Sequence, residues 1–153
     1  MLKKGSTVPD VLLLGRHGQA VRLYSLLGKG PLVIYFYPKD DTLVCTREAC
    51  RFRDADAAFS VLGASVIGIS ADGPGSHLAF ARRHRLPFKL LSDPGDAAFR
   101  AFGLKKFLGF KERATFVVDA HGTVQAVVTG RLSAAKHVRR ALEALQVQRL
   151  ANS

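Results

Sequence analysis

The chain of 153 residues contains two cysteines, Cys45 and Cys50, which lie five positions apart. Both follow a strand-like apolar run, and Cys45 falls where a helix-like pattern begins. At the start of a helix, unpaired backbone N–H groups and the positive end of the helix dipole stabilise a thiolate, which is the nucleophilic form of cysteine. We therefore interpret segment 38–50 as a redox-active site.

The spacing of the two thiols predicts a switch. If residues 42–52 form one regular helix, the Cα atoms of Cys45 and Cys50 lie about 8.7 Å apart. A disulfide spans roughly 7 Å at most between Cα atoms. A bond between the two sulfurs therefore requires the first turns of the helix to unwind, so we expect a folded helix in the reduced state and local unwinding in the oxidised state.

Other interpretations of the cysteines stay open. Free cysteines are often small buried apolar residues, an interpretation that fits Cys50 better than Cys45, because Cys45 stands near the helix start and near polar neighbours. Zinc sites contain closely spaced ligand pairs, whereas the histidines of this chain are scattered. The pair on one predicted helix face, His77 and His84, is separated by roughly 10 Å. We expect no metal, and interpret the histidines as surface or core residues: His17, His77, His84, His121 and His137.

Four further residues could assist a reactive thiol. Thr42 either caps the helix by accepting a backbone N–H or donates its hydroxyl toward the sulfur, and its spacing favours the cap. Pro38 ends the preceding strand and fixes the loop that carries the thiol. Glu48 is a carboxylate in an early helix turn, favoured there by the dipole. Arg113, just before a later strand, is by its position one of many exposed arginines.

These residues need a sheet to position them. Residues 32–37 form a continuous apolar run, which is typical of a strand covered on both faces. Apolar residues recur at helical spacing over 42–63, which predicts one helix packed on that strand. Alternation of such elements predicts an α/β fold of thioredoxin-like type: a single domain over 1–153, with a mixed central sheet flanked by helices and an N-terminal hairpin. The other expected strands are 11–14, 20–24, 65–70, 88–91, 115–118 and 123–129, and the other expected helices are 76–84, 96–102 and one that begins at 133.

The composition limits the possible classes of protein. A hydrophobic content of 48% is enough for one buried core. No apolar run approaches the roughly 20 residues of a membrane span, so we expect a soluble, cytoplasmic protein without a membrane partner. Twenty-three Lys and Arg against twelve Asp and Glu give a net charge of +11. Such a field attracts anions, but the basic runs lack an aromatic stacking platform, so no specific nucleic-acid partner is expected.

Several segments stand in a fixed order along nearly the whole chain: 8–10, 35–42, 45–50, 52–54, 66–72, 86–88, 90–93 and 113–119. Segment 35–42 reads YFYPKDDT, and segment 45–50 reads CTREAC. Together they resemble the signature of the peroxiredoxin family, most closely its bacterioferritin comigratory protein branch. The chain departs from that branch at Leu43 and Val44, where Pro-Gly is usual, and at Arg51, where a small residue is common.

The resemblance implies a role for each candidate residue. Cys45 is the peroxidatic cysteine in this alignment of motifs, and Thr42 forms a hydrogen bond near its sulfur. Pro38 shields that sulfur from water, and Arg113 reaches the thiolate and the peroxide. Glu48 matches a position that orders the hydrogen bonds of the site.

The resemblance also implies a reaction cycle. Cys50 matches the resolving cysteine of family members that carry both thiols in one helix. The expected function is a thiol-specific peroxidase for antioxidant defence, which reduces hydrogen peroxide and alkyl hydroperoxides and is recycled by thioredoxin or a similar dithiol. No metal, haem, flavin or other cofactor is expected, and the protein is expected to be a monomer or a weak dimer.

Two other classes of function compete with this interpretation. A thiol-disulfide oxidoreductase could use the same fold, but that chemistry normally needs Cys-x-x-Cys, and here four residues separate the cysteines. A basic binding module could use the fold only as a scaffold, because a fold alone does not determine function.

Overall fold

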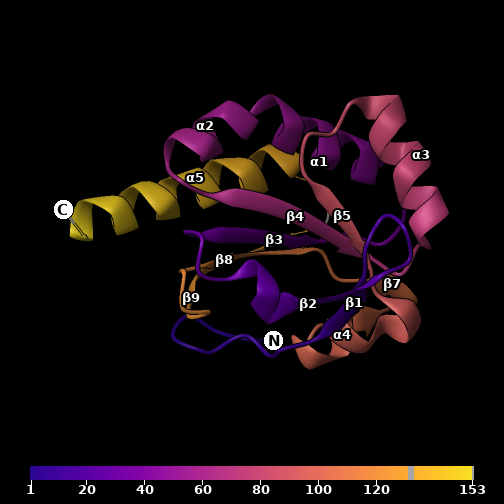
Figure 1. The fold of residues 1–153 in the computed structure, drawn as a ribbon, viewed down its shortest axis with the longest axis horizontal. Coiled ribbons are helices and arrows are strands. Elements are labelled where there is room, and N and C mark those ends of the chain that lie inside the picture. The colour runs from indigo at the N-terminus through magenta and orange to yellow at the C-terminus, as the bar shows by residue number, and fades with distance from the viewer. Residues whose placement is uncertain (131–132, 153) are drawn as a thin grey trace.

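Seven strands form one mixed sheet in the order β2-β1-β5-β4-β3-β8-β9 (Figure 1). The structure, a computed structural model, describes residues 1–130 and 133–152. Strands β3, β4 and β5 are parallel, whereas β1, β2, β8 and β9 run antiparallel to their neighbours. The strands are β1 Leu12–Leu14, β2 Ala20–Arg22, β3 Leu32–Phe36, β4 Ser65–Ser70, β5 Lys89–Ser92, β8 Ala114–Val118 and β9 Val124–Thr129. The mixed sheet and the N-terminal hairpin are confirmed.

Strand β3 is central, as its apolar run predicts. It pairs with β4 on one side and with β8 on the other. Val33 and Tyr35 belong to the apolar cluster on one face of the sheet, and Leu32, Ile34 and Phe36 to the cluster on the other. The period-2 alternation of a strand therefore buries the whole run, and both faces of the sheet are covered.

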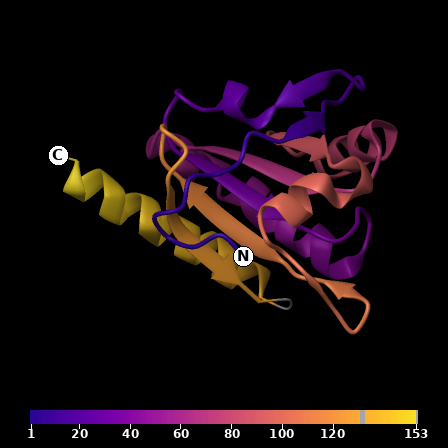
Figure 2. The same ribbon diagram turned by 90° about the horizontal axis from the view of Figure 1, so that it is seen from below.

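Helices cover the sheet on both faces. Their bounds are α1 Leu43–Asp54, α2 Asp56–Val61, α3 Pro74–His84, α4 Ala97–Ala101 and α5 Ala134–Ala151, with 3-10 turns at Leu23–Leu26 and Pro94–Asp96. Side chains of α1, α2, α3 and α5 pack into the cluster on one face, and α4 with the N-terminal segment packs on the other. Figure 2 shows this second layer, with α4 and the N-terminus lying on the opposite side of the sheet from α5. Cys45, near the start of α1, thereby lies in one apolar cluster with residues of β3, β8 and α5.

The expected single helix over 42–63 is wrong, because the chain forms two helices that break at Ala55 (φ −94°, ψ 0°). The break redirects the chain, so that Phe52 and Phe59 are both fully buried with their rings stacked 5.9 Å apart. The short hairpin of β6 Lys106–Phe107 and β7 Phe110–Lys111 was not expected. Its two-residue strands are too short to give an alternating pattern.

The long helices α1, α3 and α5 each bury only part of their surface. Within residues 1–130 and 133–152, no helix combines the length and the apolar character that crossing a bilayer requires.

Candidate active site

Cys45 lies in the first turn of α1 and is 0% exposed, whereas Cys50, in the next turns, is half-buried. Both thiols are free. The expectation that burial fits Cys50 better than Cys45 is therefore wrong. The first turn of α1 packs directly against the sheet, and the polar neighbour of Cys45 reaches it from inside the molecule.

That neighbour is Arg113, whose Nη2 donates to Cys45 Sγ over 3.0 Å. Its Nη1 donates to Glu48 Oε1 over 3.3 Å. Arg113 directly precedes β8, which pairs antiparallel with β3. This pairing places the arginine beside Cys45 at the start of α1. It is only 7% exposed, which corrects the expectation of an exposed arginine drawn from its position alone. A guanidinium beside a sulfur stabilises negative charge on that sulfur.

Glu48, one turn after Cys45, is the third member of this buried cluster. Burial raises the pKa of Glu48 from 4.5 to about 7, although the charge and the hydrogen bond of Arg113 oppose the rise. Glu48 lies in an early turn of α1, as expected, but it is buried and its carboxylate accepts a hydrogen bond from Arg113. Glu48 shares the guanidinium with the sulfur, and its charge changes near neutral pH.

Replacing Glu48 by glutamine should remove a pH-dependent loss of stability. The unfolded carboxyl releases its proton near pH 4.5 and the folded one near pH 7, so the unfolded state binds fewer protons between these values. The free energy of unfolding of the wild-type protein therefore falls as the pH rises through this window, by about 3 kcal/mol. Urea unfolding at about pH 5 and about pH 7.5 measures most of this fall, about 2 kcal/mol. An equal fall in Glu48→Gln would contradict the assignment.

His137 of α5 and Thr115 of β8 extend the cluster, and analysis of the sequence missed both as site residues. His137 Nε2 donates to Gly130 O over 2.9 Å, so Nδ1 is left to accept the Thr115 hydroxyl at 2.7 Å. Nδ1 also lies 3.8 Å from Glu48 Oε2. Burial lowers the pKa of His137, and the charges of Arg113 and Lys136 add to this effect. His137 therefore lies beside Glu48 as a neutral side chain and adds no positive charge to the site.

A signal for His137 was present in the sequence, since it stands next to the apolar positions of the amphipathic final helix. His137 was expected on the surface or in the core, and it is buried in the core. Only the pairing of α5 with β8 and α1, however, brings it near Glu48.

Thr42 occupies the N-cap position of α1, but its side chain forms no capping hydrogen bond. Its hydroxyl donates to Lys39 O over 3.0 Å instead. Because a hydroxyl carries a single hydrogen, Thr42 does not donate to the sulfur in this state. Neither role expected for Thr42 is found. Pro38 ends the strand as expected and is half-buried.

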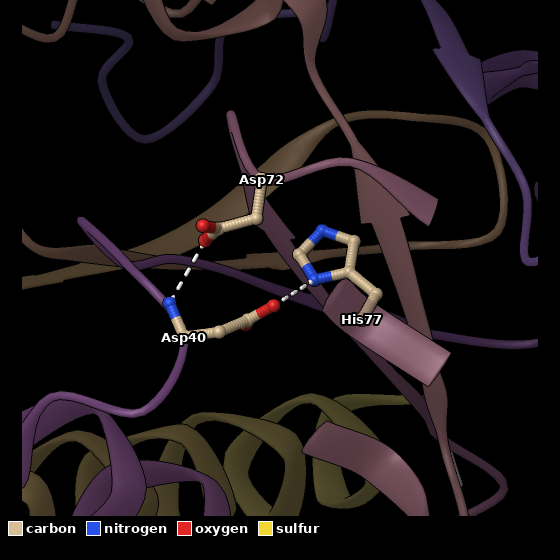
Figure 3. Close-up of side chains that lie close together, drawn as sticks. All are labelled: Asp40, Asp72 and His77. Carbon is tan, nitrogen blue, oxygen red and sulfur yellow. Dashed lines mark hydrogen bonds and ion pairs between the residues drawn. The ribbon is translucent and has the colours of Figure 1, made fainter. Parts of the chain in front are cut away.

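A second polar cluster anchors the same loop to α3 (Figure 3). His77 Nδ1 lies 2.7 Å from Asp40 Oδ2, and Asp40 also accepts from the hydroxyls of Tyr37 and Ser76. Burial alone would raise the pKa of Asp40, but hydrogen bonds from His77, Tyr37 and Ser76 together with the charge of His77 hold it below its ordinary value. Asp40 N–H in turn donates to Asp72 Oδ2 over 2.8 Å.

Asp40, Asp72 and His77 each offer a ligand atom, and these atoms lie within 4.8 Å of one another. Protein donors already occupy both carboxylate oxygens of Asp40 and Oδ2 of Asp72, to which Ser70 also donates. These bonds provide the compensation that a cation would otherwise supply. We therefore interpret this cluster as an anchor of the loop and not as a metal site.

A thioredoxin-like sheet that places an enclosed cysteine at a helix start, beside a buried arginine, defines a thiol-dependent redox enzyme. The comparisons with known proteins specify which kind. Residues 4–127 match the model of the AhpC/TSA family. The chain belongs to this family, that of the peroxiredoxins, and to its branch of bacterioferritin comigratory proteins and peroxiredoxin Q.

Relatives of known sequence and structure support this placement. Chloroplastic peroxiredoxin Q of Gentiana triflora is 44% identical and covers 95% of this chain and 67% of its own. Peroxidoxin BcpB of Mycobacterium tuberculosis has a TM-score of 0.88 at 37% identity, with 96% and 98% of the two chains covered. A bacterioferritin comigratory protein of Xanthomonas campestris has a TM-score of 0.81 at 32% identity, with 97% of each chain covered. The predicted fold class, family and thiol peroxidase activity are confirmed.

Proposed function

We propose that Cys45 is the thiol that reduces the peroxide. The observation that carries this proposal is the contact of 3.0 Å between Arg113 Nη2 and Cys45 Sγ. The Cys45 thiolate attacks the terminal oxygen of the hydroperoxide, an S–O bond forms, and the O–O bond breaks. The leaving oxygen carries away the electron pair and takes up a proton, so water or an alcohol departs and Cys45 becomes a sulfenic acid.

Arg113 serves both partners of this step. Its guanidinium stabilises the thiolate before the attack and the negative charge that moves onto the leaving oxygen during it. Glu48 competes for the same guanidinium through Nη1 and so fixes its orientation. Thr42 assists once its hydroxyl leaves Lys39 O and turns toward the peroxide, and Pro38 limits the access of water.

Peroxide reaches the enclosed sulfur through the loop that precedes α1. Leu43 and Val44, which replace the usual Pro-Gly, are the first two residues of α1. Leu43 is 67% exposed and Val44 is half-buried, so one of the two side chains is directed to solvent. We expect a small displacement of this loop to open the path, because Thr42 and Leu43 have few buried contacts to lose.

Cys50 resolves the sulfenic acid. Both cysteines lie within the continuous helix α1, so its first turns must unwind before the sulfurs can meet. The Cys50 thiolate then displaces the oxygen of the sulfenic acid as water, and a disulfide forms. An external dithiol restores both thiols by exchange.

In Cys50→Ser the sulfenic acid should persist, because no second thiol is present to displace its oxygen. Treatment with hydrogen peroxide and then dimedone should label Cys45, as peptide mass analysis would show. The wild-type protein treated in the same way serves as the matched control and should give little adduct. If Cys50→Ser gave no adduct, Cys50 would not be the resolving thiol.

The substrates proposed are hydrogen peroxide and organic hydroperoxides. The Xanthomonas campestris relative is described as having alkyl peroxide reduction activity, which supports the second class. Thioredoxin is the reductant that we propose, and the cytoplasm is the proposed compartment, although the plant relatives are chloroplastic. A monomer or a weak dimer stays the predicted assembly.

A further inference from the structure

A cavity separate from the thiol site lies between α3, the β1–β2 turn and the segment 86–91. Its volume is about 420 Å³, which falls in the range of small-molecule sites. Most of its wall is apolar, as shown by Val21, Leu78, Leu86, Phe88 and Leu91. A cavity with such a wall can hold an aliphatic chain or a ring.

The charged side chains that line the cavity are all basic: Arg16, Arg82 and Lys89. Their side chains are exposed and have no hydrogen bond or ion pair with any residue in 1–130 or 133–152. Among those described residues, no carboxylate lines the cavity. The positive field at its mouth is therefore not neutralised from within the molecule, and it favours an anionic ligand.

One residue of the wall, His77, has a buried nitrogen without a partner. His77 is 2% exposed, and its Nδ1 is bonded to Asp40. Its Nε2 is buried and has no hydrogen-bond partner among the residues that the structure describes. Figure 3 shows this nitrogen on the edge of the ring that points away from the Asp40 carboxylate. An unsatisfied buried polar atom destabilises a protein, and a ligand atom that bonded to it would relieve this cost.

We propose that this cavity binds a small amphipathic anion, with its apolar body against Leu78, Leu86 and Phe88 and its carboxylate or phosphate head on His77. The ring Nδ1–H donates to Asp40, because a carboxylate only accepts. With an anion bound, Nε2–H donates to the head group on the side of the ring that points away from Asp40. Arg16, Arg82 and Lys89 attract the anion to the mouth.

This site would be connected to the peroxidase loop. His77 contacts Asp40, and Asp40 lies two residues before Thr42 in the loop that leads to Cys45. The proposal itself depends only on the cavity and on His77, and so it stands or falls independently of the roles assigned to the two cysteines.

Titration of the reduced, full-length protein with defined probes tests the proposal. Calorimetry with decanoate and with octyl phosphate should show saturable binding at one site, at least about tenfold tighter than with decanol, acetate or inorganic phosphate. The tighter of the two anions identifies the preferred head group. In ¹⁵N-labelled protein, the bound anion should shift the His77 Nε2 resonance. Equal affinity for decanol, or an unmoved Nε2 resonance at saturation, would overturn the proposal.

Variants locate the site. R82Q/K89Q should weaken decanoate binding by about tenfold, because both cations lie in the wall. Arg140→Gln, an exposed change on α5, is the matched control and should bind like the wild-type protein. Ala81→Phe should fill the cavity and abolish binding, with thermal unfolding as the check that it folds. If R82Q/K89Q and the control bound decanoate equally, the anion would not lie in this cavity.

Discussion

Replacing Cys45 by serine should abolish peroxide consumption in an assay with thioredoxin and its reductase. A serine hydroxyl is not ionised near neutral pH, and Arg113 at 3.0 Å from the sulfur cannot make it an equivalent nucleophile. The loss should be complete within detection, because the proposed mechanism has no second thiol that can take its place. The measurement is the steady-state rate of hydrogen peroxide removal.

Cys50→Ser is the matched control for this change. It has the same substitution within the same helix, but it should still react once with peroxide before it stops. If the Cys45→Ser protein kept turnover, the nucleophile would be a residue other than Cys45. A Cys50→Ser protein unable to react even once would show that the pair cannot be divided into attacking and resolving thiols.

Changing Arg113 to methionine should slow the reaction of the thiol with peroxide by about 10²–10³-fold. The guanidinium contacts both Cys45 Sγ and Glu48 Oε1, so its loss leaves the sulfur without its cation and the carboxyl without its partner. Rapid-mixing measurement of sulfenic acid formation isolates this step from the later reduction of the disulfide.

Arg139→Met is the matched control, because Arg139 is an exposed arginine whose only close carboxylate within the described residues is Glu143, at 3.9 Å. It should react at the wild-type rate. Arg113→Lys keeps the charge but loses the two-pronged geometry, and an intermediate rate is expected. An unchanged rate in Arg113→Met would show that the charge of the reaction is stabilised elsewhere.

Local patterns were sufficient to predict most of the fold. The apolar run of β3 and the alternation of strands and helices depend on burial and periodicity, which are written in neighbouring residues. The position of Cys45 at a helix start follows from the same patterns. Motifs along nearly the whole chain then indicated the family by resemblance, and the comparisons confirm it.

The meeting of distant side chains could not be derived from local patterns. Arg113 stands 68 positions from Cys45, and the contact exists because β8 pairs antiparallel with β3 beneath α1. His137 reaches the same cluster from α5, and the sequence contains no signal of that pairing. For Arg113, resemblance supplied the expectation that spacing alone could not.

Details of the loop before α1 could not be predicted from the sequence either. The Thr42 hydroxyl had several possible partners, and the direction of the Lys39 carbonyl determines which one it takes. Similarly, the break at Ala55 depends on how Phe52 and Phe59 pack against the sheet. Such choices are made by tertiary packing and not by propensity.

Peptide mapping after one equivalent of hydrogen peroxide determines which of the two thiols takes the oxygen atom. Trypsin cleaves after Lys39, Arg47 and Arg51, so Cys45 and Cys50 fall in separate peptides, 40–47 and 48–51. In the wild-type protein, we expect a disulfide between these two peptides. In Cys50→Ser we expect one added oxygen on the peptide with Cys45. If the oxygen were found on Cys50 in Cys45→Ser and peptide 40–47 stayed unmodified in Cys50→Ser, Cys45 would not be the attacking thiol.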